Sequence, residues 1–227
     1  MIPRPAQHCD TKSGEPLKGA LKDASRHPKK AGLLLRSTTV IVHCADPNPA
    51  VKLPLMNDWK PEFRKVWDRG VAAWKQGRRS AQTMFSSEDV ALLASIGCTA
   101  QELFDFVDDS LNYDDLDYET TLAVTDIRRR YFLEVMGGKP TGRKVSMSTL
   151  PAKSAKVDGI AWLPRLIAKA RLKLRGEMEP DLMYGCGGDR PFLREHRMTL
   201  PQFLQLVWDK GDNDRAIVDA VKAAAKS

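Results

Sequence analysis

A self-similarity at a spacing of 100 residues is the feature that most constrains the fold of this 227-residue chain. At that spacing, residues 99–109 read TAQELFDFVDD and residues 199–209 read TLPQFLQLVWD. Each segment opens with a threonine followed three residues later by Glu or Gln, the capping box that starts a helix. Each also follows a short helical pattern and precedes another, which predicts two related helix triplets. The alternative is that two amphipathic helices with similar caps resemble each other by chance.

Helical periodicity runs through most of the chain after residue 57. We expect helices over 61–76, 86–96, 99–111, 118–136, 164–175, 199–210 and 212–224. On the helix that begins at Pro164, the expected buried stripe is Leu163, Leu166, Ile167, Ala170 and Leu174, surrounded by Arg165, Lys169, Arg171, Lys173 and Arg175. The sequence therefore predicts a mainly α fold of two packed helical subdomains, with the repeated helix triplet as an interpretation.

Charge and composition suggest the domain boundaries. Residues 1–57 have a net charge of +5 and are rich in proline, which predicts a basic, mostly irregular extension with one candidate strand at 34–43. An acidic helical subdomain is expected at 58–138, a linker at 139–158 and a basic helical subdomain at 159–227. The acidic and basic halves either face each other or leave a basic face for an anionic partner.

The sequence favours a soluble, cytoplasmic protein. No stretch approaches the roughly 18 to 20 consecutive apolar residues that span a bilayer, so we expect no membrane span. Four widely spaced cysteines fit a reducing compartment better than a small disulfide scaffold. The basic first 57 residues lack the order of a signal peptide, and a transit segment stays open.

The stretch MYGCGGDRPFLREH, residues 183–196, is the strongest candidate for a site. Its structural interpretation is a glycine-permitted turn into a helix, with Asp189 accepting amide hydrogens of the following turn. In the functional interpretation, Cys186 is a nucleophile or ligand, and Tyr184 handles a proton. The amides of that turn then form an anion site, which Arg190, Arg194 and Arg165 reinforce.

Metal and cofactor binding find little support in the sequence. Cys186 and His196 have no second pair to complete a zinc site, so no metal is predicted there. Asp105, Asp108 and Asp109 share one helix face and are either oxygen ligands for a divalent cation or a solvated face. The sequence contains no phosphate-binding loop, dinucleotide fingerprint or nucleophile elbow, and the cofactor is left unknown.

The segment from Gly159 to Leu193 resembles the bacterial domain-of-unknown-function family 5069. The matching positions are Leu163, Pro164, Arg165, Lys169, Ala170, Arg171, Gly176, Tyr184, Cys186, Asp189, Phe192 and Leu193. Ala168 departs from the family's usual aspartate, so any role of that aspartate does not transfer. The resemblance covers about the last 70 residues, and residues 58–138 look like the longer members. It implies a soluble bacterial helical protein of unestablished activity in which these polar residues act together.

Three functions follow from these features. The first is a small-molecule enzyme or binder with a cationic pocket for an anionic ligand; its catalytic candidates are Cys186, Tyr184 and Asp189, and its ligand-binding candidates are Arg165, Lys169, Arg171 and Arg190. The second is a protein-interaction or assembly subunit that docks through residues 1–57. The third is a nucleic-acid binding module, which is the least favoured because the acidic middle would repel phosphates.

Overall fold

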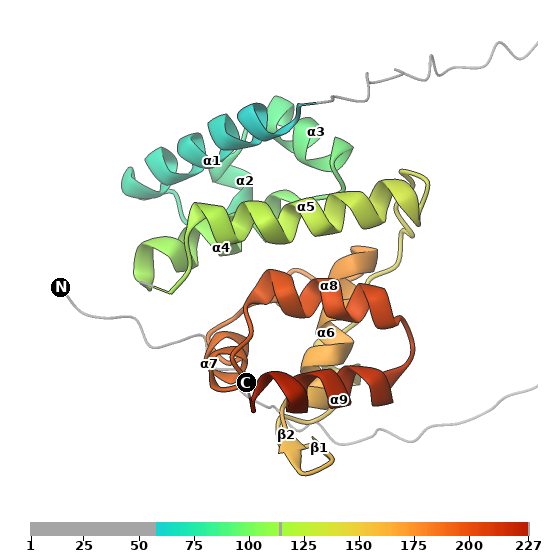
Figure 1. Ribbon diagram of the computed structural model, residues 1–227. Helices are drawn as coiled ribbons and strands as arrows, with labels where there is room; N and C mark the ends of the chain where they lie inside the picture. Colours follow the sequence, from blue (N-terminus) through green and yellow to red (C-terminus); the bar gives the residue numbers. More distant parts are fainter. Residues whose placement is uncertain (1–57, 114, 227) are drawn as a thin grey trace, which may run out of the picture. The chain divides into compact units, whose positions relative to one another are not determined.

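Helix starts and stops in the sequence set the order of elements in the computed structural model, which describes residues 58–113 and 115–226. Within those residues the elements are α1 (Lys60–Lys75), α2 (Ala81–Met84), α3 (Ser87–Ser95), α4 (Ala100–Asn112), α5 (Tyr118–Glu134), the 3-10 helix η1 (Met147–Thr149), β1 (Lys156–Val157), β2 (Ile160–Ala161), α6 (Leu163–Arg175), α7 (Asp189–Glu195), α8 (Leu200–Lys210) and α9 (Asp214–Ala224) (Figure 1). The predicted mainly α fold is confirmed. The predicted extension at 1–57, with its candidate strand, lies outside the described residues.

Capping boxes begin the helices where the sequence predicts them. Thr99 and Thr199 each accept the backbone N–H of the residue three positions on, whose side chain returns a bond to the threonine N–H. Ser86 and Asp89 form the same reciprocal pair at the start of α3. Because these bonds satisfy amides that have no partner inside the helix, they fix where each helix begins.

The ends of α3 and α7 are also alike at the 100-residue spacing. The N–H of Cys98 donates to the Leu93 carbonyl at 2.9 Å, and the N–H of Met198 donates to the Leu193 carbonyl at 2.9 Å. In both turns the chain leaves the helix through a residue in the left-handed conformation just before the N–H donor. This residue is Gly97 after α3 and Arg197 after α7. The same helix–turn–helix unit therefore occurs twice.

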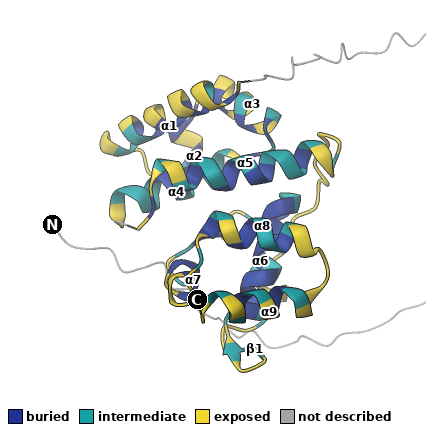
Figure 2. Ribbon diagram, in the orientation of Figure 1, coloured by how far each residue is buried: buried dark blue, intermediate teal, exposed yellow. Residues whose placement is uncertain are grey.

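The correspondence between residues 100 positions apart extends to the long helices α1 and α6. The buried residues of α1 are Phe63, Val66, Trp67, Gly70 and Ala73, and the residues 100 positions later, Leu163, Leu166, Ile167, Ala170 and Lys173, are also buried. Helix α1 packs on α4, and α6 packs on α8. Helix α5 packs on both α6 and α8 and so joins the two halves (Figures 1 and 2).

More residues of helix α6 are buried than its apolar stripe predicts. The stripe is buried as expected, but Arg165, Lys169 and Lys173, predicted to surround it, are buried too. The expectation was wrong because α5, α8 and the β1–β2 hairpin contact α6 from several sides. The long stems of these side chains pack in the interior while their charges find partners inside the chain.

The predicted linker at 139–158 contains short structured pieces. Val145 forms an isolated bridge with Met178, and its N–H donates to the Glu177 carbonyl at 2.8 Å. Val145, Met147 and Leu150 pack against the core, and β1 pairs with β2 in an antiparallel hairpin. This segment therefore lies across the surface of the second half.

No single helix of the described part of the chain combines the length and apolarity of a membrane span. Helices α3 and α4 pass that test only when joined, and they meet at a bend of 101°.

Replacing Gly97 with alanine should destabilise the protein more than replacing Gly77. Both glycines have positive φ, which costs an alanine about 1 kcal/mol. A Cβ on Gly97 would also lie 2.6 Å from Phe132 Cγ, whereas nothing lies within 4 Å of one on Gly77. Urea unfolding should show losses of about 1 kcal/mol for Gly77→Ala and ~3 kcal/mol or more for Gly97→Ala. Equal losses would show that Phe132 does not constrain this turn.

Candidate functional site

The centre of the predicted site is a buried ion pair between Lys169 of α6 and Asp189, the first residue of α7. Their side chains are 3% and 0% exposed. Lys169 Nζ donates to Asp189 Oδ2, which also accepts the Gly185 N–H at 2.9 Å. Burial lowers the pKa of Lys169, but Asp189 and Cys186 outweigh that effect and hold the pKa above its ordinary value. Lys169 is therefore a cation at neutral pH.

Cys186 lies beside this ion pair and is partly exposed. Lys169 Nζ donates to Cys186 Sγ at 3.2 Å. The thiolate is the nucleophilic form of cysteine, and a neighbouring ammonium stabilises its charge. Asp189 in turn binds Lys169, so the arrangement is a thiol, an ammonium and a carboxylate in hydrogen-bonded sequence.

Trp162 completes the surroundings of Asp189, and sequence reasoning missed it. The indole Nε1 donates to Asp189 Oδ1 at 3.0 Å from a residue 27 positions earlier in the chain. The Trp162 ring lies against Gly188, where an added Cβ would be 2.5 Å from ring atom Cζ2. A tryptophan at φ +68° is unusual, and these contacts hold it there. Gly188 permits this approach because it has no Cβ, but no sequence signal identified the tryptophan.

The predicted cap at Asp189 is wrong. The residue before α7 is Gly188, which has no side-chain cap, and Asp189 is already helical. Its carboxylate points back to Gly185, Lys169 and Trp162 instead of forward along the helix. Two donors that are distant in sequence bind the carboxylate, and nothing in the local pattern showed that they would be there.

Two further candidates have structural partners next to this cluster. Tyr184 is buried, its hydroxyl donates to the Leu200 carbonyl at 2.8 Å, and burial raises its pKa well above the ordinary value. Arg190 donates to the Gly185 carbonyl at 2.7 Å and to Asp109 of α4 at 2.5 Å. Both side chains therefore fix the turn that carries Cys186.

The remaining candidates lie outside the cluster. Arg165 donates to the Pro151 carbonyl at 2.8 Å, and Arg171 donates to the Gly211 carbonyl at 2.7 Å and to Asp214 at 2.5 Å. The structure thus brings Lys169, Cys186 and Asp189 together and does not bring Arg165 and Arg171 to them. Helix α6 directs these charges to partners within the chain.

The residues that build this arrangement, from Trp162 to Arg190, fall within a single family match. Residues 148–227 match a domain of unknown function, DUF5069. The predicted resemblance is confirmed for this C-terminal third, called the DUF5069 region below. Residues 58–138 lie outside the match, and their likeness to longer members stays a prediction. Neither a search of curated proteins nor one of solved structures gave a match.

The ion pair of the DUF5069 region has a counterpart 100 residues earlier. Arg69 of α1 forms an ion pair with Asp89 of α3, at the positions equivalent to Lys169 and Asp189. The Arg69 side chain is 54% exposed, whereas that of Lys169 is 3% exposed. Ser86, whose hydroxyl caps α3, stands where the DUF5069 region has Cys186. Both halves therefore have an ion pair that joins the long helix to the short helix. Only the second half has a thiol beside this ion pair and a cation that is deeply buried.

The three aspartates for which a cation site was one alternative are not assembled as a metal site. Asp105 accepts from Gln101 Nε2 at 2.8 Å, Asp108 accepts from Trp74 Nε1 at 2.7 Å, and Asp109 binds Arg190. Within the described residues, no group of three or more His, Cys, Asp or Glu side chains is placed to hold a metal ion. The acidic half instead binds cations of the basic half, as one interpretation of the charge pattern predicted.

A second buried ion pair joins the halves. Lys173 of α6 donates to Glu102 of α4 at 2.8 Å, with both side chains largely buried. Asp105 lies near Glu102, and burial, together with the Glu102 and Asp109 charges, raises the pKa of Asp105 to about 7. These groups and Tyr184 line a cavity of about 10 Å³, which is too small for a substrate. Lys169, Cys186 and Asp189 do not line it.

Removing Lys169 should cost far more stability than removing Arg69. Lys169→Met leaves Asp189 buried without its cation, a loss of about 3 kcal/mol or more. Arg69→Met removes a half-exposed cation from an Asp89 that keeps its capping bonds, a loss of about 1 kcal/mol. Urea unfolding of the two variants compares the same position in each half. Similar losses would show that the deeper burial of Lys169 carries no extra energy.

Asp105 should make the protein less stable as pH rises. Between its ordinary pKa of 3.8 and its folded pKa of about 7, the folded state holds more protons than the unfolded state. The free energy of unfolding should therefore fall from pH 4 to pH 7, and Asp105→Asn should flatten that fall. Asp181→Asn, at an exposed position, is the control in urea unfolding across this range. An unchanged slope in Asp105→Asn would contradict the assignment.

Proposed function

We propose that this protein is a small-molecule enzyme or binder in which the Cys186 thiol reacts with an electrophilic ligand. The observation that carries the proposal is the 3.2 Å hydrogen bond from Lys169 Nζ to Cys186 Sγ, with Lys169 held by Asp189. Lys169 acts as a cation rather than a base, because its raised pKa keeps it protonated. The thiol proton passes to solvent and the sulfur bonds to the electrophilic carbon, from which either a leaving group departs with its bonding electrons or a double bond opens and takes up a proton. The Lys169 ammonium faces the sulfur throughout this step.

Comparison of the two halves supports a chemical role for Cys186. A structural tie between the long and short helices needs only an ion pair and a cap, as Arg69, Asp89 and Ser86 provide. The second half replaces the capping serine with a cysteine and places an ammonium on its sulfur. The arginines predicted to clamp an anion have partners within the chain, so the proposal specifies the reacting group of the ligand rather than its charge.

The other two predicted functions find no specific support in the described residues. The docking arm at 1–57 lies outside them, so a protein partner stays a prediction. The cations of α6, which motivated nucleic-acid binding, are buried or bound to partners such as Glu102 and Asp214.

Cys186 should be alkylated in the folded protein and Cys98 should not. Cys98 is buried, and burial raises its pKa to about 12, so it is an internal control. The full chain with Cys9→Ser and Cys44→Ser leaves only these two thiols, and iodoacetamide labelling is followed by peptide mass spectrometry. Lys169→Arg should keep most of the rate, and Lys169→Met should slow it about tenfold if still folded. Equal labelling of Cys98 and Cys186 would show no activation.

The ligand itself can be sought through covalent adducts. We expect a library of small electrophiles to include members that add to the full chain carrying Cys9→Ser and Cys44→Ser and fail to add when Cys186→Ser is also present, as measured by intact mass. Cys98→Ser in that background is the matched control and should react as the parent chain does. Adducts that persist in Cys186→Ser, or unfolding midpoints that move in it without any ligand, would place Cys186 in a structural role.

A further inference from the structure

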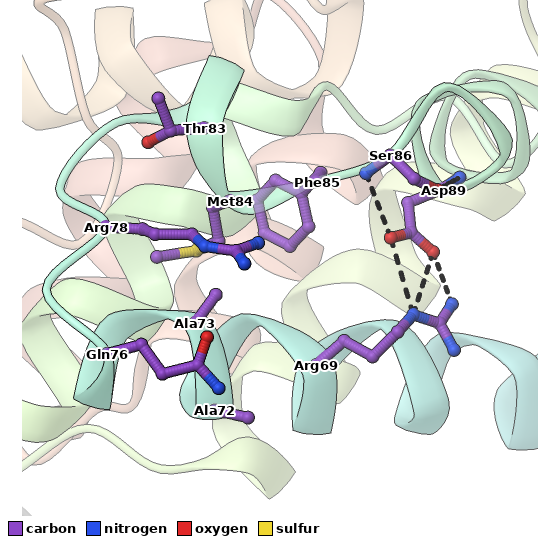
Figure 3. A pocket seen from close by; sticks show the side chains of 10 residues that line it. All are labelled: Arg69, Ala72, Ala73, Gln76, Arg78, Thr83, Met84, Phe85, Ser86 and Asp89. Carbon is purple, nitrogen blue, oxygen red and sulfur yellow. Dashed lines mark hydrogen bonds and ion pairs between the residues drawn. The ribbon is translucent and has the colours of Figure 1, made fainter.

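A hollow lies in the first half of the chain, among residues 69–89 and away from Cys186. It has a volume of about 390 Å³ and is formed by the inner face of α1, by α2 and by the start of α3 (Figure 3). That volume falls within the range of small-molecule sites, roughly 300 to 1,000 Å³. Residues 58–113 contain every residue that lines it.

The floor of the hollow is apolar. Ala72 and Ala73 of α1 line it together with Met84 and Phe85, and all of these except Ala72 are buried. The hollow exists because α1 carries two small residues here. The residues 100 positions later on α6 are Leu172 and Lys173, and both are buried. The first half therefore has two small residues where the second half has two longer ones.

A cation without a partner lies over this floor. The Arg78 side chain extends across the hollow towards Met84 and Phe85 (Figure 3). Within the described residues its guanidinium has no recorded hydrogen bond or ion pair. Its neighbours are occupied: Arg69 binds Asp89, and Arg79 donates to the Trp74 carbonyl and stacks on the Trp74 ring. Arg78 is therefore the cation of the hollow that is available to a ligand.

We propose that this hollow binds a small organic anion with an apolar body, its acidic group on Arg78 and its body against Met84, Phe85 and the two alanines. A guanidinium binds carboxylate, sulfonate or phosphate oxygens with two parallel hydrogen bonds. The apolar surface that the floor leaves exposed, mainly at Ala72, gains from being covered by an apolar body. The Gln76 amide, at the same end of α1, offers a further donor to the acidic group. The site is independent of Cys186 and of the function proposed above.

The probe is 8-anilinonaphthalene-1-sulfonate, an aromatic anion whose fluorescence rises in apolar surroundings, titrated into the full chain. Arg78→Gln should weaken binding about tenfold, the usual loss for a charged hydrogen bond. Ala72→Phe should abolish binding, because Ala72 is exposed on the hollow and the ring would fill it without disturbing the core. Octanoate should compete with the probe, and octylamine should not.

Lys75→Gln is the matched control, because Lys75 is an exposed cation of the same helix that does not line the hollow. It should change the dissociation constant by less than about twofold. Cys186→Ser should bind as the wild type does, which separates this site from the proposed thiol chemistry. Urea midpoints of the variants should match the wild type, so that probe binding reports the hollow and not loosened structure. Unchanged binding in Arg78→Gln and Ala72→Phe, or no binding by the wild type, would overturn the proposal.

Discussion

The Asp189 carboxylate organises the DUF5069 region, because three donors from separate segments converge on it. Lys169 comes from α6, the Trp162 indole precedes that helix, and the Gly185 N–H belongs to the turn before α7. A buried carboxylate is costly unless its oxygens are hydrogen-bonded and its charge is balanced, and here both conditions are met. The geometry of the turn, including the position of Cys186, follows from that requirement.

The two halves share one arrangement of helices but differ in how deeply their equivalent ion pairs are buried. Each has a long helix tied by an ion pair to a short one, a left-handed turn, and a capping box that opens the next helix. In the first half the tie is half exposed and borders an open hollow. In the second half the tie is buried, and a thiol lies beside it. The buried Lys173–Glu102 pair and α5 then join the halves into one packed unit.

The candidate residues fall into two groups, according to whether their partners belong only to the fold or include the partly exposed Cys186 sulfur. Arg165, Arg171 and Arg190 bind backbone carbonyls or carboxylates that belong to the fold, so their charges stabilise turns and helix contacts. Lys169 also binds a carboxylate, yet it reaches a partly exposed sulfur at the same time. The density of polar residues made this segment a candidate, but only the direction of each side chain separated Lys169, Cys186 and Asp189, which lie together, from the arginines, which hold other parts of the chain.

The sequence by itself determined the longer helices, the capping boxes at Thr99 and Thr199 and the 100-residue repeat, because capping and periodicity are local properties read from neighbouring residues. Predictions from the sequence were wrong where the position of a side chain depends on a contact with a residue that is distant in the sequence. The burial of Lys173 depends on Glu102, 71 positions away, and the inward turn of Asp189 depends on Trp162 and Lys169. The hollow under Arg78 depends on alanines whose significance appears only once α1 faces α2. Only the tertiary structure decided these features, because the burial of a charge and the presence of a cavity depend on residues that are distant in the sequence and pack against them.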